Sequence, residues 1–239
     1  MAGTALVTGA SSGIGEACVR ALTVAGWQVL AMARRAEPLQ ALCSDTGATP
    51  LIADVRDTGA VAAVLQGQAV DLLVNNAGLG AGMSGLVGAS AEDLERTIDT
   101  NVRALLDVTR QVLPGMTARR RGHVVNLGSV AGLYPINSAV YGGSKGAVHL
   151  ISQNLRLELR GTGIRVSEIC PARVATEFFQ VAIGQDVVVP IKILSPDDIA
   201  EAVMFAVEAP DHVNVSMIEI QPVEQSFGAI HFDPVEPAP

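Results

Sequence analysis

Short apolar runs alternate with longer helical patterns from one end of the chain to the other, and this alternation constrains the fold more than any other feature. It predicts an α/β fold in which right-handed crossovers wind a parallel sheet on both faces. Suitable capping residues, Asp57, Ser90 and Ser195, precede three of the expected helices. The seven expected strands cover residues 4–8, 28–33, 49–53, 71–75, 123–127, 165–169 and 217–220.

The composition agrees with a sheet buried on both faces. Hydrophobic residues make up 49% of the 239 residues but aromatic residues only 3%, so the core must be aliphatic. No repeat or linker divides the chain. We therefore expect one domain over residues 1–227, including a long, weakly patterned segment at 172–194 that is typical of a substrate loop or lid. The proline-rich tail, residues 228–239, is either frayed or reaches a neighbouring subunit.

The charge balance argues against a nucleic-acid partner. The 16 basic and 24 acidic residues give a net charge of −8, whereas nucleic acids require a basic footprint. The one basic run, residues 119–121, suits the end of a helix.

The three cysteines form no CxxC pair, the first strand leaves no room for a leader, and no apolar run approaches a membrane span. We expect a soluble cytoplasmic protein. The four histidines show no metal-ligand spacing, so no metal site is predicted.

A glycine-rich turn, TGASSGIG, follows the first expected strand and opens a helix. Glycines at positions 9, 13 and 15 let the backbone bend tightly and approach a pyrophosphate, which the free N–H groups and the dipole of the helix N-terminus attract. The spacing is GxxxGxG and departs from the commoner GxGxxG. Its place after the first strand of an α/β pattern nevertheless predicts a Rossmann-type dinucleotide site.

The end of the second expected strand indicates which dinucleotide binds. An acidic residue there would accept hydrogen bonds from a free ribose 2′-hydroxyl, whereas arginine suits a 2′-phosphate. The chain has Ala33 at the acidic position, followed by Arg34 and Arg35, and guanidinium groups bind phosphate through paired hydrogen bonds. Two solvated arginines that merely open a helix are disfavoured, because cations oppose the helix dipole there. We therefore predict NADP(H) over NAD(H).

Polar residues also end the next two expected strands. Asp54 could accept a hydrogen bond from the adenine amino group, and the two amides of Asn75-Asn76-Ala77-Gly78 suit the lining of a cofactor crevice. Taken singly, each is also an ordinary turn residue. Together, at successive strand ends, they outline the crevice in which α/β sheets bind ligands.

Tyr141 and Lys145 stand four residues apart in an expected helix, so their side chains share one face. A free tyrosine titrates near pH ~10 and is a poor acid or base at neutrality, but a neighbouring ammonium group favours the phenolate and lowers the tyrosine pKa. Ser129, which comes after the fifth expected strand, could hydrogen-bond the oxygen of a reacting carbonyl or alcohol. The arrangement predicts proton transfer.

With these motifs in order, and with Asn101 between them, the chain resembles the short-chain dehydrogenases/reductases that carry TGxxxGxG and YxxxK motifs, over nearly its whole length. The resemblance implies that Tyr141 is the general acid/base, that Ser129 orients the substrate oxygen and that Lys145 binds the nicotinamide ribose. Asn101 would hold a water that extends the proton relay. The implied cofactor contacts are Gly9, Ser11, Ser12, Gly13, Ile14, Gly15, Arg34, Arg35, Asp54, Val55, Asn76, Ala77, Gly78, Tyr141, Lys145, Pro171, Val174 and Thr176.

Further stretches, such as IDTN at 98–101 and NLGS at 126–129, resemble the subgroup of serine and 3-hydroxy acid dehydrogenases. The resemblance implies NADP(H)-dependent hydride transfer on a small 3-hydroxy acid or semialdehyde. It also implies a homotetramer, in which helices near residues 92–117 and 139–160 pack against other subunits. One alternative is reduction of a larger ketone, such as a polyketide or acyl-carrier intermediate. Another is a non-catalytic NADP(H)-sensing protein, although such proteins usually lack the tyrosine or lysine that this chain keeps.

One segment departs from the family pattern. Where the family usually has Pro-Gly after the sixth strand, this chain has Pro171-Ala172-Arg173. Arg173 would then lie beside the nicotinamide and could bind an anionic group of the substrate. It could equally turn to solvent or to the cofactor phosphates. The predicted substrate-binding residues are Ser129, Tyr141 and Arg173.

Overall fold

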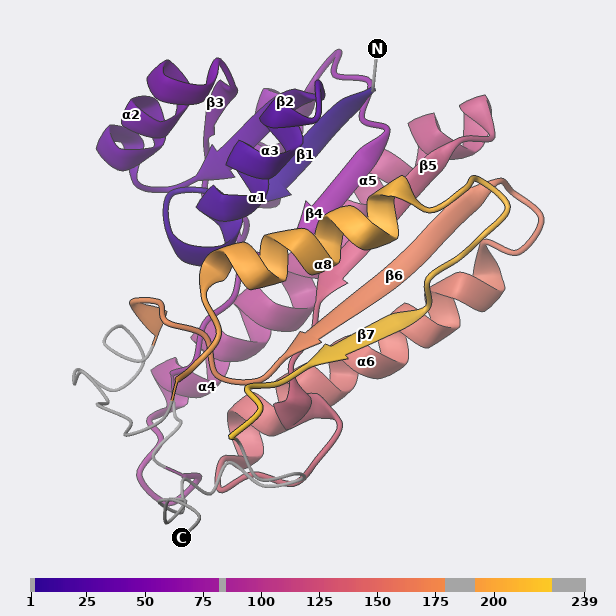
Figure 1. Ribbon diagram of the computed structural model, residues 1–239. Coiled ribbons are helices and arrows are strands. Elements are labelled where there is room, and N and C mark those ends of the chain that lie inside the picture. The colour runs from indigo at the N-terminus through magenta and orange to yellow at the C-terminus, as the bar shows by residue number, and fades with distance from the viewer. Residues whose placement is uncertain (1–2, 82–84, 179–191, 225–239) are drawn as a thin grey trace, which may run out of the picture.

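A computed structural model of the chain describes residues 3–81, 85–178 and 192–224 (Figure 1). Seven strands form one parallel sheet in the order β3-β2-β1-β4-β5-β6-β7, which confirms the predicted doubly wound, seven-stranded Rossmann fold. The order reverses direction next to β1, and this reversal opens the crevice at the carboxyl ends of the strands. The strands are β1 (Thr4–Thr8), β2 (Gln28–Ala33), β3 (Thr49–Ile52), β4 (Leu72–Asn75), β5 (Gly122–Leu127), β6 (Ile164–Pro171) and β7 (Met217–Ile220).

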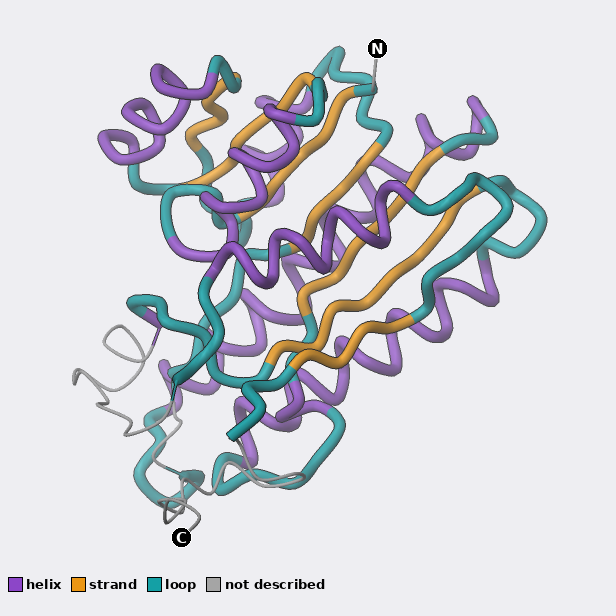
Figure 2. The backbone as a smooth tube through the Cα atoms, in the orientation of Figure 1, coloured by secondary structure: helices purple, strands orange, loops and turns teal. Residues whose placement is uncertain are grey.

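Helices cover both faces of the sheet (Figure 2). Aliphatic side chains fill the space between the layers. One face packs against α1 (Gly13–Val24), α2 (Ala36–Thr46) and α8 (Pro196–Glu208). The other packs against α3 (Thr58–Leu65), α5 (Ala104–Arg119) and α6 (Ala139–Glu158). In Figure 1, α8 crosses in front of the sheet and α6 lies behind it. The predicted aliphatic core is confirmed, because both clusters of buried residues consist of Val, Leu, Ile, Ala, Met and Cys.

The predicted helix caps are in place. The Asp57 carboxylate accepts hydrogen bonds from the backbone N–H groups of Gly59 and Ala60, both at 3.0 Å. Ser90 and Ser195 each form a reciprocal capping box, at the starts of α4 (Ala91–Ile98) and α8. These side chains satisfy N–H groups that a helix N-terminus otherwise leaves without partners. The basic run at 119–121 lies exposed at the end of α5, as predicted.

The helix expected over residues 92–117 is interrupted. A π-helical turn, Asp99–Arg103, separates α4 from α5, and such turns occur mostly as local bulges at functional sites. Sequence periodicity does not reveal this turn. It buries Asn101, whose side chain bonds to residues far away in the chain. Most of the predicted substrate loop and the whole tail, residues 179–191 and 228–239, lie outside the described residues. Within the described ranges no helix is long and apolar enough to cross a membrane.

Candidate active site

A cavity of about 450 Å³ opens at the carboxyl ends of the strands, where the loops after β1 to β6 meet. All the predicted catalytic, cofactor and substrate residues line it except Gly15 and Asn101. Tertiary structure thus brings together side chains that are spread over most of the chain. The two exceptions act from behind the wall of the cavity.

The glycine turn after β1 has the geometry expected for a phosphate cradle. Gly9 and Gly13 have φ angles of 66° and 57°, in the left-handed region that favours glycine. A side chain at Gly15 would collide with the backbone of Gly9, so Gly15 permits close packing of α1 on the turn without lining the cavity. Ser12 begins α1 without a side-chain cap, which leaves the first N–H groups of the helix to serve an anion. Asn76 ties this turn to the end of β4, since its amide nitrogen donates to the Thr8 carbonyl oxygen at 2.9 Å.

The two predicted arginines occupy different positions. The Arg35 guanidinium lies across the glycine turn and donates to the Ser12 hydroxyl at 2.6 Å and the Ser11 hydroxyl at 3.2 Å. Arg34 lies 3.8 Å from the Asp54 carboxylate, with 61% of its side chain exposed. A dinucleotide with a 2′-phosphate fits this arrangement, because both guanidinium groups belong to residues that line the same cavity as a turn whose backbone N–H groups attract phosphate.

Asp54 carries a partner that the sequence analysis missed. Arg56 forms a bidentate ion pair with it, with Nη2–Oδ2 and Nε–Oδ1 distances of 2.7 and 3.1 Å. The hydrogen bonds from the Arg56 side chain hold the pKa of Asp54 below its usual range. The carboxylate therefore stays ionised as an acceptor, in the place where the adenine end of the cofactor was expected. Arg56 itself also lines the cavity.

Tyr141, Ser129 and Lys145 meet at the other end of the cavity, all buried. Burial raises the pKa of Tyr141 to about 12, and the hydrogen bond with Ser129 opposes that rise. Lys145 donates to the Leu127 carbonyl oxygen at 2.7 Å, and its Nζ lies 6.0 Å from the centre of the Tyr141 ring. Burial lowers the pKa of Lys145 to about 8. The expected lowering of the Tyr141 pKa by Lys145 is therefore wrong for the protein without cofactor. Desolvation disfavours the charged form of each residue, and at this separation the two charges do not stabilise each other enough to offset it.

Asn101 lies in the π-helical turn and is only 2% exposed. Its amide nitrogen donates to the Ser144 hydroxyl at 2.9 Å and to the Leu79 carbonyl oxygen at 2.8 Å, while its carbonyl oxygen accepts from the Leu79 N–H at 2.7 Å. The side chain thus joins α6, which carries Tyr141, to the segment that follows β4. Its observed contacts are structural ones, made behind the cavity wall.

The segment after β6 closes the cavity opposite the turn. Arg173 is 6% exposed and lines the cavity, and burial lowers its pKa. Backbone pairing between Val174 and Leu194 fixes this segment. The Phe178 ring lies 5.5 Å from the Tyr141 ring at an interplanar angle of 53°, so an aromatic side chain covers the tyrosine.

A family model for short chain dehydrogenases matches residues 3–186. The chain belongs to the short-chain dehydrogenase family. The NADP-dependent 3-hydroxy acid dehydrogenase YdfG of Salmonella typhi is 43% identical over 240 residues, which cover 94% of this chain and 97% of that protein. A probable NADP-dependent dehydrogenase of Haemophilus influenzae is also 43% identical, over 95% of this chain and 96% of its own. The closed form of serine dehydrogenase complexed with NADP+ matches with a TM-score of 0.89 and 40% identity, over 95% and 98% of the two chains.

Membership of the short-chain dehydrogenase family confirms the predicted oxidoreductase class, and the names of these relatives agree with the prediction of NADP(H). Arg56 and Phe178 line the cavity without having been predicted from the sequence. For Arg56 a signal was available, since an arginine two residues after a strand-end aspartate can reach back to it. Phe178 carried none, because the path of the chain after β6 decides where its ring lies.

Proposed function

We propose that the protein is an NADP(H)-dependent oxidoreductase that interconverts a small 3-hydroxy acid, or a related semialdehyde-forming alcohol, with its carbonyl form. The observation that carries this proposal is the meeting of Tyr141, Ser129 and Lys145 at one end of a cavity whose other end is a phosphate cradle. The names of the similar relatives, a 3-hydroxy acid dehydrogenase and a serine dehydrogenase, support the choice of substrate class.

Three groups of residues would hold the cofactor. The turn at Gly9–Gly13 and the N-terminus of α1 suit its pyrophosphate. Arg34 and Arg35 suit the 2′-phosphate, and Lys145 the hydroxyls of the nicotinamide ribose. When bound, the cofactor supplies or accepts the hydride.

The protein's own residues then handle the oxygen and its proton. Ser129 hydrogen-bonds the substrate oxygen, and Tyr141 donates a proton to it during reduction or accepts one during oxidation. A Tyr141 pKa of about 12 keeps the hydroxyl protonated at neutral pH, and the phenolate that is left when it donates must be stabilised by the charges around it. In the reverse direction the phenolate needs the nearby Lys145 ammonium group for stabilisation. General acid/base transfer of this kind contributes roughly 10²- to 10⁴-fold in rate.

Arg173 gives the site its preference for an anion. Its guanidinium is largely withdrawn from water and lines the cavity that Tyr141 also lines. An arginine stays charged even when burial lowers its pKa, and a positive charge in the lining of the cavity attracts an anionic group of the substrate. A small substrate with a carboxylate meets this condition.

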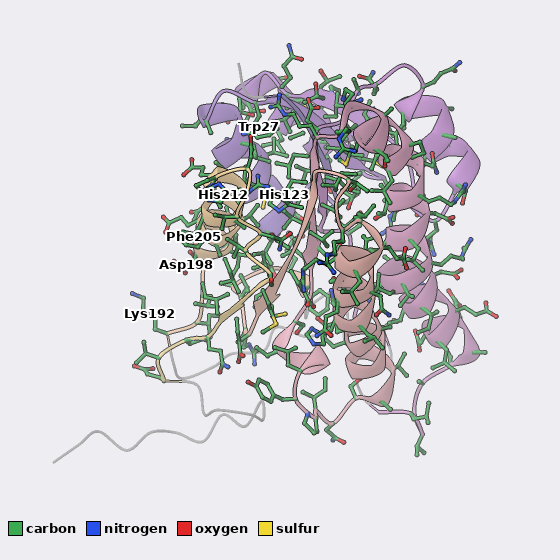
Figure 3. The ribbon with its side chains drawn as sticks, turned by 90° about the vertical axis from the view of Figure 1, so that its right-hand side faces the viewer. Trp27, His123, Lys192, Asp198, Phe205 and His212 are labelled. Atoms are coloured by element: carbon green, nitrogen blue, oxygen red, sulfur yellow. The ribbon has the colours of Figure 1, made fainter. Side chains whose placement is uncertain are left out.

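The same chain would assemble as a soluble cytoplasmic homotetramer. Large apolar side chains are exposed on α5 and α6, namely Leu106, Leu150 and Leu157 at 45%, 56% and 72%. On α8, Phe205 is 67% exposed and lies along the same edge of the molecule as Asp198 (Figure 3). We infer that these exposed side chains contribute to the contacts between subunits.

A substrate panel tests the function. NADPH oxidation would be followed with small semialdehydes and 3-keto acids, with uncharged analogues of the same size, and with larger ketones. We expect the small anionic compounds to have the highest kcat/KM and Arg173→Ala to lose about tenfold or more for these compounds alone. Preference for the larger ketones would favour the polyketide-type alternative. NADPH binding without turnover on any compound would favour the sensing protein.

Tyr141→Phe tests the mechanism itself. The variant should lose turnover by roughly 10²- to 10⁴-fold, while NADPH affinity, measured by fluorescence titration, stays close to that of the wild type. Retained turnover would reject Tyr141 as the proton donor.

A further inference from the structure

The side chain of Glu168 is a buried carboxylate that lies behind the loop carrying Ser129 and has no part in the proposed function. Glu168 is on β6 and is 1% exposed. His149, on α6, contacts it with an Nδ1–Oε2 distance of 2.8 Å, and Gln153 contacts the other ring nitrogen of His149 at 2.7 Å. His149 and Glu168 line a second cavity of about 370 Å³ between α6 and β7, away from the cofactor crevice.

The second oxygen of Glu168 faces the active site. Oε1 accepts no hydrogen bond from an N–H or O–H group of the described residues, and the Cys170 thiol donates one to the Glu168 carboxylate. It lies against Gly128, where an added side chain would collide with it and would lie 2.9 Å from the Cys170 sulfur. Gly128 stands between Leu127, whose carbonyl oxygen binds Lys145, and Ser129. The carboxylate therefore lies directly behind the backbone that carries the serine and anchors the lysine.

We propose that Glu168 is a positioning residue of the active site, whose buried negative charge keeps Lys145 protonated while His149 fixes the carboxylate in place. The proposal rests on the role of Lys145 in the proposed function. Glu168 does not touch substrate or cofactor; it acts through the lysine.

The charges around Lys145 support this role. Two ionisable groups of β6 face the lysine, Cys170 and Glu168. Burial is the main cause that raises the pKa of the Cys170 thiol, with Glu168 adding to it, so the thiol is neutral at working pH. On the lysine's own helix Tyr141 is neutral, because its pKa is about 12, and His149 is held on the far side of the carboxylate.

The remaining neighbours of Lys145 bring no negative charge. Arg173, in the segment after β6, is a cation that lines the same cavity. The loop 127–133 has no ionisable side chain, and the π-helical turn presents the neutral Asn101. Among the described residues packed around the lysine, Cys170 and Glu168 oppose the lowering of its pKa by burial. Because the Cys170 thiol is neutral, loss of the Glu168 carboxylate would leave desolvation with little opposition, and Lys145 would release its proton at a lower pH.

The test compares Glu168→Gln with Glu219→Gln, which removes a carboxylate from the same second cavity but not from beside the lysine. The pKa of Lys145 would be measured by NMR titration of its ammonium group in the cofactor-free protein, with Lys145→Ala to assign the signal. We expect Glu168→Gln to lower it by about one unit, and the alkaline limb of the kcat/KM profile to move down in pH by the same amount. Glu219→Gln should leave both the lysine pKa and the alkaline limb unchanged. Glu168→Asp keeps a carboxylate and should hold the lysine pKa close to that of the wild type.

An unchanged lysine pKa in a folded Glu168→Gln variant would overturn the proposal. Should that variant not fold, the carboxyl carbon of Glu168 can be followed in the wild type. It should shift as Lys145 titrates, whereas that of Glu219 should not, and a Glu168 signal insensitive to the lysine would overturn the proposal equally. Both titrations are independent of turnover. A failure of the proposed function would appear instead as an active Tyr141→Phe variant, so the two failures can be told apart.

Discussion

Arg34 and Arg35 show how neighbouring residues of one type take different parts in a site. Arg35 is committed to the glycine turn and also lies 3.5 Å from the Glu177 carboxylate. Arg34 has its long-range contact with Asp54 at 3.8 Å and keeps most of its side chain in solvent. Arg34 can therefore bind a 2′-phosphate without first breaking a short hydrogen bond. Arg35 would have to exchange its hydrogen bonds to Ser11 and Ser12 of the glycine turn to do the same.

We expect Arg34→Asp to weaken NADPH binding by roughly 10- to 100-fold, the effect of losing a charge-assisted contact, and to improve NADH binding. The measurement is a fluorescence titration with both cofactors. Arg110→Asp makes the same charge change on α5, at a side chain that is 70% exposed and outside the cavity lining, and should leave both affinities unchanged. Undiminished NADPH affinity in Arg34→Asp would exclude this arginine from cofactor selection.

His123 makes a pH-dependent contribution to stability. It is buried in β5, with Nε2 2.8 Å from the Ser167 hydroxyl, and burial, aided by the charge of Arg165, lowers its pKa to about 3. An unfolded chain takes up a proton here near pH ~6.5, whereas the folded protein does not until about pH 3. The unfolded state thus binds more protons in this window, and stability falls as the pH falls through it.

His123→Gln should remove this dependence while keeping a polar partner for Ser167. Between about pH 7 and pH 4.5, the wild type should lose roughly 2–3 kcal/mol more of its unfolding free energy than the variant. Urea unfolding at the two pH values measures the difference. The matched control is His212→Gln, at an exposed histidine labelled with His123 in Figure 3, which should retain the wild-type pH dependence.

At the scale of elements, the reciprocal cap at the start of α8 connects helix stability to the site. Ser195 accepts from the Asp198 N–H at 3.2 Å, and Asp198 accepts from the Ser195 N–H at 2.7 Å. Hydrogen bonds from the Ser195 backbone N–H and side chain to the Asp198 carboxylate hold the pKa of Asp198 below its usual range, the backbone one most strongly. The helix packs on α1, which follows the glycine turn. The cap directly follows Leu194, whose backbone pairs with Arg173 and Ala175.

Ser195→Ala should lower the unfolding free energy by about 1 kcal/mol, the usual cost of losing a serine N-cap. Ser44→Ala serves as the control, because Ser44 lies within α2 and its hydroxyl only donates to the Gln40 carbonyl oxygen. Alanine is the better helix former at such a position, so no loss is expected there. Equal urea midpoints for Ser195→Ala and the wild type would show that the cap does not stabilise the protein.

At the scale of the whole molecule, the proposed tetramer would use helices that carry exposed apolar side chains. Such side chains also occur elsewhere, as at Val24 on α1, but α6 carries two of them, Leu150 and Leu157. A tetramer would bury this surface, so assembly would also stabilise the helix that presents Tyr141 and Lys145.

Sedimentation should show a wild-type particle of about four chains of 24.7 kDa. Replacing both Leu150 and Leu157 by lysine should shift it to smaller species, because charged side chains are costly at a buried interface. Val24→Lys changes a side chain that is 90% exposed on α1 and should leave the mass unchanged. A monomeric wild type, or a leucine variant of unaltered mass, would contradict the proposed assembly.

Sequence patterns alone predict the parallel sheet, the glycine turn, the pair of arginines and the face shared by Tyr141 and Lys145. Each of these follows from local spacing or from the rule that parallel strands end at one edge of the sheet. Of the residues predicted for the site, the cavity takes in all but Gly15 and Asn101.

The remaining features depend on how the layers of the fold pack against one another. Burial sets the direction of the pKa shifts of Tyr141 and Lys145. The π-helical turn that buries Asn101, and the position of Glu168 behind Gly128, depend on contacts between residues far apart in the chain. Desolvation and long-range packing are properties of the assembled layers, and no pattern of neighbouring residues encodes them.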